Sequence, residues 1–458
     1  MRKKKEVTDT VKNASNNSTI SITPRGCFYP LLVIALCIRI YFGATVSLRA
    51  SHKVLKIVLC QIPGLGKSNA PSHCTIKIWA EKIGYYKLNH RKAQARNWNI
   101  IIDASIQIGP NKCFVILGCP SDKVPQGRPL ALDDCEPIMI KITDKLNGDL
   151  VASWLHECAK NIGSIDVICS DKGSDMLKGI RLFRSKNLNT LHIPDTAHRV
   201  ANLIKNKLSN DDRWKDFKKS LTQARREMQH SSFTEALPPN MRAKARFMNV
   251  GAIIRWGTDM LKLHYSPPIE FQADYFQQYL GWIIEYQTDL KRWLMFIDIA
   301  ETAKEVVRDG MTHNIETRYT ESLAGIEMDI DGQVFSDEIC QFLNSISQTL
   351  HLERVYIGSS EIIESFFGKM KRMEGDQTSF GFTSLVLAAA ATVGSTSIEM
   401  IEQALSTVKT RNIQEWITSQ IGTSIQSRRK KLKCSLQKIK FDMDTKTTGF
   451  LLGKAAGF

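Results

Sequence analysis

The chain has 458 residues, of which 43% are hydrophobic and 24% are charged. These proportions are typical of a folded globular protein and exclude general disorder and a polytopic membrane protein, while the length predicts several folded units. The net charge of +16 favours a polyanionic partner, because lysine and arginine side chains that neutralise phosphates release condensed counterions. The 11 cysteines form no CxxC pair and are odd in number, which argues against a zinc ribbon and a disulfide framework.

The N-terminal part divides into a polar arm and a helical segment. Residues 1–25 are polar and basic without apolar periodicity, so we expect a flexible basic arm. Residues 26–96 predict short helices at 31–41, 47–59 and 72–83, which favour a helix-turn-helix-like DNA-binding module over a small packing domain. The third helix would be the recognition helix, and the basic side chains on or after it that we expect to contact DNA are Lys77, Lys82, Lys87 and Arg91.

An apolar run at 28–38 follows the basic arm and superficially resembles a signal anchor. It is too short to cross a bilayer, which takes roughly twenty apolar residues. We therefore expect a buried helix there, with a membrane anchor as the less favoured alternative.

Residues 97–208 alternate between strands and helices. The apolar patterns predict strands at 99–108, 113–118 and 138–142, a helix at 148–160, a strand at 165–170, a helix at 175–185, a strand at 190–193 and a helix from 196. This βββαβαβα order is that of an RNase H-like α/β core with a mixed five-stranded sheet. We expect an all-α insertion at 209–350, the last helices of the core at 351–410 and a basic tail at 411–458.

Two acids lie at positions that suit a shared metal site. Asp103 lies in an apolar run, where a carboxylate is costly to bury unless it is paired or binds a metal ion. Asp171 follows the strand at 165–170, and neighbouring strands lie about 4.8 Å apart, so both acids can reach one ion. Phosphoryl transfer between DNA strands uses two Mg²⁺ ions, which prefer oxygen ligands and which Mn²⁺ can replace. Asp166 and Asp175 remain alternatives to Asp171, although Asp166 lies at the wrong end of its strand and Asp175 suits the start of the next helix.

The third acid is expected on a helix at 361–373. Glu364 shares a face with Lys371 two turns later, so the acid can bind metal while the cation lies along the DNA backbone. Glu361, one turn earlier, lacks such a cation and remains the alternative. The basic residues of this helix and of the tail that we expect to bind DNA are Lys369, Lys371, Arg372, Arg428, Arg429, Lys430 and Lys431, although a charge run in a tail is often only solvated.

The segment from Pro194 to His198 follows the last predicted strand. By spacing, Asp195 can cap the next helix and face His198 across its first turn, orienting the imidazole near the acids. The alternative is that Asp195 is only a cap and His198 an ordinary interior histidine.

With these residues the chain resembles DDE-type transposases of the bacterial insertion-sequence kind, whose RNase H-like core is interrupted by a helical insertion. Asp103, Asp171 and Glu364 match the acidic triad of that family, and Asp195 with His198 resembles its C/D-x-x-H motif. The resemblance implies a DNA transposase that cleaves transposon ends and joins them to target DNA by two-metal phosphoryl transfer. It also implies a homo-oligomer on DNA, without a membrane, in the cytoplasm and associated with the nucleoid.

Two other functions remain open at this point. One is a catalytically silent DNA-binding protein derived from a transposase, and the other is an RNase H-like structure-specific nuclease that cuts without joining.

Overall fold

A computed structural model shows how the chain folds. It describes residues 23–44, 46–61, 70–90, 92, 95–106, 110–240, 250–266, 273–374, 381–423, 425 and 427–437. Arg91, most of the expected arm and the last part of the expected tail lie outside the described residues.

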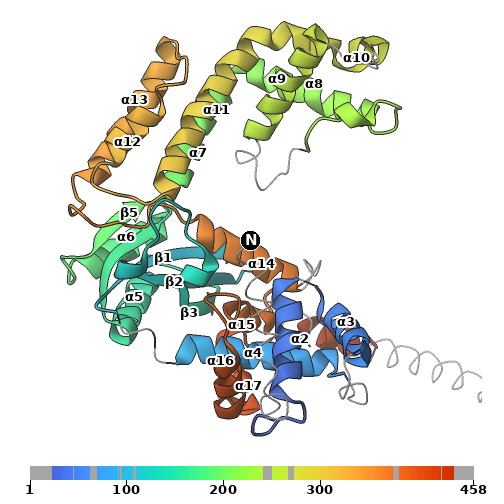
Figure 1. The fold of residues 1–458 in the computed structure, drawn as a ribbon, viewed down its shortest axis with the longest axis vertical. Coiled ribbons are helices and arrows are strands. Elements are labelled where there is room, and N and C mark those ends of the chain that lie inside the picture. Colours follow the sequence, from blue (N-terminus) through green and yellow to red (C-terminus); the bar gives the residue numbers. More distant parts are fainter. Residues whose placement is uncertain are drawn as a thin grey trace, which may run out of the picture.

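A five-stranded mixed sheet forms the centre of the molecule (Figure 1). Its strands lie in the order β3-β2-β1-β4-β5, with β2 antiparallel to both β1 and β3, and with β4 parallel to both β1 and β5. The early strands are thus joined as antiparallel neighbours, and the later ones are reached by helical crossovers, as the predicted element order requires. The bounds are β1 Asn97–Ile106, β2 Lys112–Pro120, β3 Glu136–Thr143, β4 Ser164–Ser170 and β5 Leu191–Pro194.

Helices cover both faces of the sheet. Ile100 and Ile102 of β1 point to one face, where they are buried in a core with α5 (Gly148–Ile162) and α6 (Ser174–Arg184). Ile101 points to the other face and is buried in a core with α14 (Glu361–Glu374). Because side chains alternate along a strand, the two faces of β1 carry different chemistry at successive residues.

A helical region stands beside the sheet and is joined to it by two long helices (Figure 1). Helices α7 and α11 run side by side from the sheet into this region, whose core contains Trp214, Phe217 and Trp293. Helices therefore account for most of the part expected to be an all-α insertion. The bounds are α7 Thr196–Ser209, α8 Asp212–Met228, α9 Val250–Tyr265, α10 Ala273–Leu280, α11 Gln287–Arg308, α12 Ile315–Ser322 and α13 Ile330–Ser347.

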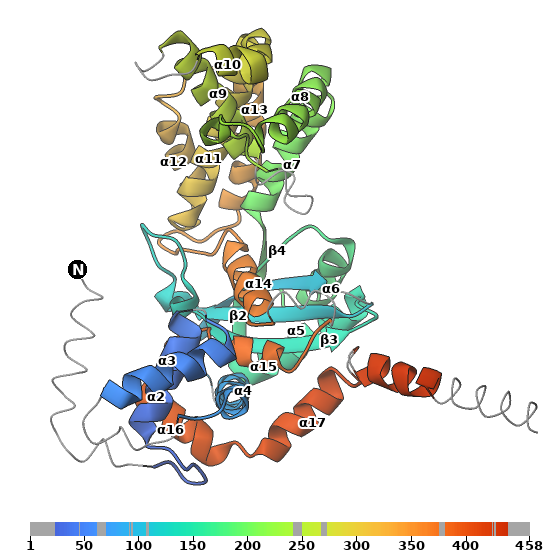
Figure 2. The same ribbon diagram turned by 90° about the vertical axis from the view of Figure 1, so that its right-hand side faces the viewer.

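The N-terminal helices pack against the C-terminal ones (Figure 2). Helices α2 (Leu31–Gly43), α3 (Leu48–Gln61) and α4 (His73–Asn89) share a core with α15 (Leu385–Ala390) and α16 (Ile398–Thr407), and α17 (Thr410–Gln420) also contacts α4. A Cβ added at Gly84 of α4 would lie 1.8 Å from the carbonyl oxygen of Leu387, so α4 and α15 meet backbone to backbone. The expected recognition helix therefore lies between two layers of helices.

Helix α2 contains most of the apolar run that resembled a signal anchor. It is 13 residues long, and Leu31, Ile34 and Ile38 are buried in the shared helical core. None of the helices in the described part of the chain combines the length and the apolar character that crossing a membrane requires.

Candidate functional site

Asp103 and Asp171 lie next to each other on adjacent parallel strands. Ile102 of β1 pairs with Ser170 of β4, so each acid comes one residue after the last paired position. Because side chains alternate between the two faces of a strand, Asp103 lies on the same face as Ile101, and Asp171 on the same face as Cys169. Ile101 and Cys169 are buried in the core that contains α14. The strand register thus puts both acids on the α14 face of the sheet.

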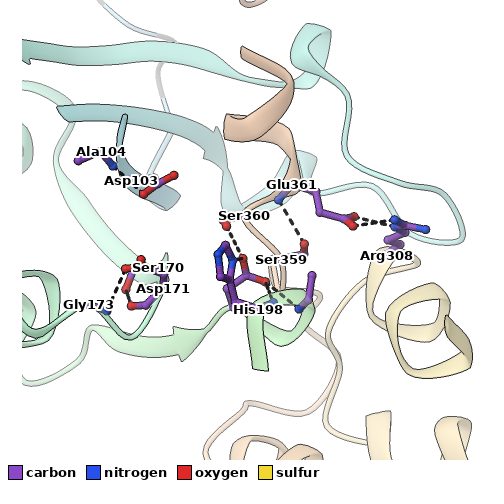
Figure 3. Close-up of polar contacts among 12 residues, drawn as sticks. Asp103, Ala104, Ser170, Asp171, Gly173, His198, Arg308, Ser359, Ser360 and Glu361 are labelled. Carbon is purple, nitrogen blue, oxygen red and sulfur yellow. Dashed lines mark hydrogen bonds and ion pairs between the residues drawn. The ribbon is translucent and has the colours of Figure 1, made fainter. Parts of the chain in front are cut away.

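Backbone amides hold one oxygen of each acid (Figure 3). The Ala104 N–H donates to Asp103 Oδ1 at 2.6 Å, and the Gly173 N–H donates to Asp171 Oδ1 at 3.1 Å in the turn after β4. Among the described residues, neither carboxylate forms a salt bridge. These hydrogen bonds therefore fix the orientation of both carboxylates.

Helix α14 supplies the third acid. Its buried side includes Ile363, Phe366 and Met370, which pack on the sheet, and Glu364 lies half-buried at the edge of that side. Burial raises the pKa of Glu364, whereas the charges of His198 and Lys371 lower it. Glu364 and Lys371 lie two turns apart on α14, and their roles at a metal ion and along DNA stay predictions.

The alternative acids have other partners. Arg308 donates from Nε and Nη2 to the two carboxylate oxygens of Glu361, both at 2.6 Å, so Glu361 points away from Asp103 (Figure 3). Asp166 accepts a hydrogen bond from Ser121 Oγ at 2.9 Å, near the opposite end of β4 from Asp171. Asp175 lies in the first turn of α6, on the face of the sheet opposite α14. This geometry favours Asp171 and Glu364.

Asp195 connects α7 to two of the elements that carry the acids, β4 and α14. It caps α7 by accepting hydrogen bonds from the backbone amides of Ala197 and His198, and its own N–H donates to the Ser170 carbonyl at 2.8 Å. Its Oδ2 accepts hydrogen bonds from His198 Nδ1 at 2.9 Å and from the hydroxyl of Ser360, which precedes α14 (Figure 3). The buried carboxylate of Asp195 thus joins α7 to the start of α14, and its backbone N–H joins both to β4.

The charges of these residues act on one another. The pKa of Asp103 is raised to about 6, chiefly by burial. The charges of Asp171 and Glu364 also raise it, whereas the hydrogen bond from the Ala104 amide and the charge of His198 lower it. The hydrogen bond that His198 donates to Asp195 is the main cause that raises the pKa of His198 to about 9, and the charges of Asp195, Glu364 and Asp171 contribute. At neutral pH the site therefore contains an imidazolium beside several carboxylates.

Burial alone would raise the pKa of Asp195, but the hydrogen bonds from His198 and Ser360 lower it. Asp195 is therefore charged when His198 is protonated, so the pair orients the imidazole toward the acids.

The acids do not form a closed ligand set. Nowhere in the described part of the chain are three or more His, Cys, Asp or Glu side chains close enough to hold a metal ion. On the α14 face, the charges of Asp171 and Glu364 instead act on Asp103. The carboxylate oxygens of these three acids are of the kind that Mg²⁺ prefers.

Lys87 corrects one prediction. Its side chain is 2% exposed, and its ammonium donates hydrogen bonds to the carbonyls of Ala391 (3.0 Å), Val393 (2.7 Å) and Gly394 (2.9 Å) and to Thr396 Oγ1 (2.8 Å). Burial lowers its pKa to about 8. Lys87 therefore joins α4 to the segment after α15 and does not lie on a surface that DNA can reach.

The other basic residues predicted to bind DNA keep some exposure. Lys77, which pairs with Glu81 at 3.5 Å, and Lys82 lie half-exposed on α4. Lys369 is half-buried beside the Leu130–Asp133 segment, on the side of α14 away from Glu364. Their role in binding DNA stays a prediction, as does that of the exposed residues Lys371, Arg372, Arg428, Arg429, Lys430 and Lys431.

Comparisons with known proteins give a distant structural likeness. No known protein family matches the sequence, and no curated protein does. Among solved structures, the chain is similar to the Drosophila P element transposase strand transfer complex, with 13% identity, coverage of 88% of this chain and 99% of that chain, and a TM-score of 0.40. This likeness is too distant to assign an activity. None of these comparisons supports the predicted resemblance to bacterial insertion-sequence transposases.

Proposed function

We propose that the chain is a DNA transposase of the DDE type, a polynucleotidyl transferase built on an RNase H-like core. The observation that carries this proposal is the register of β1 and β4, which brings Asp103 and Asp171 side by side on the face that α14 covers with Glu364. Carboxylates from two strands and one helix on one face of a mixed sheet suit metal-dependent phosphoryl transfer.

Asp103, Asp171 and Glu364 would hold Mg²⁺, with Mn²⁺ as a substitute. The chemistry that two such ions supply when bound is activation of the attacking oxygen and stabilisation of the leaving oxygen. The raised pKa of Asp103 and Glu364 means that charge on these acids is disfavoured without a cation. A divalent cation would therefore be bound most readily above about pH 6, where Asp103 loses its proton.

His198 and Asp195 would organise the site. The imidazolium lies half-exposed beside the acids, where it can donate to a phosphate oxygen of the DNA. Asp195 keeps its orientation and, through Ser360, keeps the start of α14 against α7.

DNA is the expected partner, and its ends would be held by an oligomer, because joining requires two ends in one complex. Lys371 and Arg372 follow Glu364 on α14 and are exposed, and they would neutralise the DNA backbone near the cut. Since α4 is packed between helices, a helix-turn-helix role for it would depend, among the described residues predicted to contact DNA, on Lys77 and Lys82.

The test is a cleavage and joining reaction. The purified chain is incubated in Mg²⁺ or Mn²⁺ with a plasmid carrying the DNA that flanks its gene, and cut and joined products are separated on gels. We expect Asp103→Asn, Asp171→Asn and Glu364→Gln each to reduce both products by about a thousandfold. Glu361→Gln, on the same helix but paired with Arg308, is the matched control and should retain activity.

The outcomes separate the alternatives. Cutting without joined products would favour the structure-specific nuclease, and DNA binding without any cutting would favour the silent DNA-binding protein. Equal activity of the wild type and the three acid variants would refute the proposed site.

A further inference from the structure

Two cationic side chains converge on one aromatic ring where the sheet meets the helical region. Lys172 Nζ lies 5.6 Å from the centroid of the Phe342 ring, and Arg199 Cζ lies 5.8 Å from the same centroid. The three residues come from the turn after β4, from α7 and from α13. These cation–π contacts join residues that are far apart in the sequence. They are modestly favourable and hold both cations next to the ring.

Both cations of this cluster are neighbours, in the sequence, of residues of the candidate site. Lys172 follows Asp171, and Arg199 follows His198 in the first turn of α7. The cluster therefore lies at the edge of the candidate site that faces the helical region.

Positive charge exceeds negative charge at this cluster. Glu338 lies 3.7 Å from Arg199 Nη2, at the outer limit of an ion pair, and the buried Arg199 Nε has no hydrogen-bond partner. The charges of Arg184 and Lys172 also contribute to lowering the pKa of the buried His192, which falls to about 4 chiefly because of desolvation. Gathering cations in this way is unfavourable unless an anion compensates for their repulsion.

We propose that Lys172 and Arg199, positioned by Phe342, bind backbone phosphates of the DNA strand that enters the candidate site from the side of the helical region. This inference rests on the proposed function and identifies which surface next to the acids contacts the substrate. Lysine and arginine bind phosphates without reading bases, so the contact is independent of sequence. The ring keeps two long side chains ordered, which lowers the entropy lost on binding. The helical region thus takes part in holding the substrate through α13.

The experiment measures binding separately from cleavage. All variants carry Asp103→Asn, and fluorescence anisotropy gives the affinity for a labelled duplex of about 30 base pairs of arbitrary sequence over a range of salt concentrations. Lys172→Gln with Arg199→Gln removes both cations. The charge-matched control is Lys141→Gln with Lys178→Gln, whose side chains pair with Glu157 and Asp149 on the face covered by α5.

We expect the double variant to bind roughly tenfold more weakly at about 0.1 M salt, with a slope of log affinity against log salt about two units less negative. The control should keep the slope of the parent. An unchanged slope in the Lys172 and Arg199 variant, or an equal change in the control, overturns the proposal.

Phe342→Leu tests the positioning role, because it keeps apolar bulk and removes the ring. We expect about threefold weaker binding at an unchanged melting temperature. Unchanged affinity would exclude Phe342 from the site. Failure of the proposed function has a different signature, because it would be seen in the cleavage reaction, either as no products from the wild type or as equal products from the wild type and Asp103→Asn.

Discussion

The two faces of the central sheet differ in what they bury. Toward α5 and α6 the strands present an apolar surface in which Ile100 and Ile102 are fully buried. Toward α14, Ile101 is equally buried, but Asp103 follows it on the same side and is partly exposed. Successive residues of one strand thus stabilise an apolar core on one face and provide a charged group on the other. Polar substitutions at neighbouring positions should therefore have opposite effects on the free energy of unfolding.

Ile102→Asn should give the largest loss of stability. The substitution places an amide in a closed apolar core without a partner, which costs about 4 kcal/mol of unfolding free energy. Urea denaturation followed by circular dichroism measures it. A loss below about 1 kcal/mol would show that this face tolerates polar groups.

Asp103→Asn, one residue further along β1, should stabilise the chain at pH 8 without added metal. The folded-state pKa of Asp103 is raised from 3.8 to about 6, so its favourable contribution is complete below pH 3.8 and is lost as the pH rises through 6. Asparagine keeps an acceptor for the Ala104 N–H but carries no charge, so we expect a gain of about 2 kcal/mol at pH 8.

The pH dependence provides the control for this prediction. The gain should vanish in urea titrations below about pH 4, where the wild-type carboxyl is protonated in both states. A gain of equal size at both pH values would point to a cause other than the charge.

Ser360→Ala should have an intermediate effect. It removes a buried hydroxyl that donates to Asp195, and we expect a loss of about 1.5 kcal/mol, together with a need for more Mg²⁺ in the cleavage reaction because α14 is held less firmly. Ser359→Ala is the control, since its hydroxyl accepts the Glu361 N–H and does not contact Asp195. Equal metal dependence in the two variants would remove Ser360 from the site.

Glu361→Gln should have the smallest effect. Its partner Arg308 is substantially exposed, so screening by solvent limits the ion pair to less than about 1 kcal/mol. Thermal denaturation at low and high salt measures this contribution, which should shrink as salt increases.

The sheet could be predicted from the sequence because its strands are strongly apolar runs separated by turn residues. The run from Asn99 to Ile108 corresponds to β1, and the run from Ile165 to Ser170 corresponds to β4, with differences of a few residues at the ends. Strand ends depend on pairing with distant partners, so periodicity alone does not fix them.

Contacts between distant segments could not be predicted. Lys87 looked like an exposed cation after a short helix, but its partners follow it by as many as 309 residues. The hydroxyl of Ser360 reaches Asp195 across 165 residues, and no local pattern marks that pair. Sequence spacing favoured Glu364 through Lys371, but it did not reveal that Glu361 pairs with Arg308, whose position at the end of α11 depends on the packing of the helical region.

The close approach of Gly84 to Leu387 has a consequence for how the chain is made. A ribosome releases α4 long before it has synthesised α15, so the first helices emerge with an apolar side that has no partner. They can complete their core only after α15 and α16 have been synthesised, which makes folding of this layer a late and slow event. A nascent chain truncated before residue 385 should therefore need a chaperone to remain in solution.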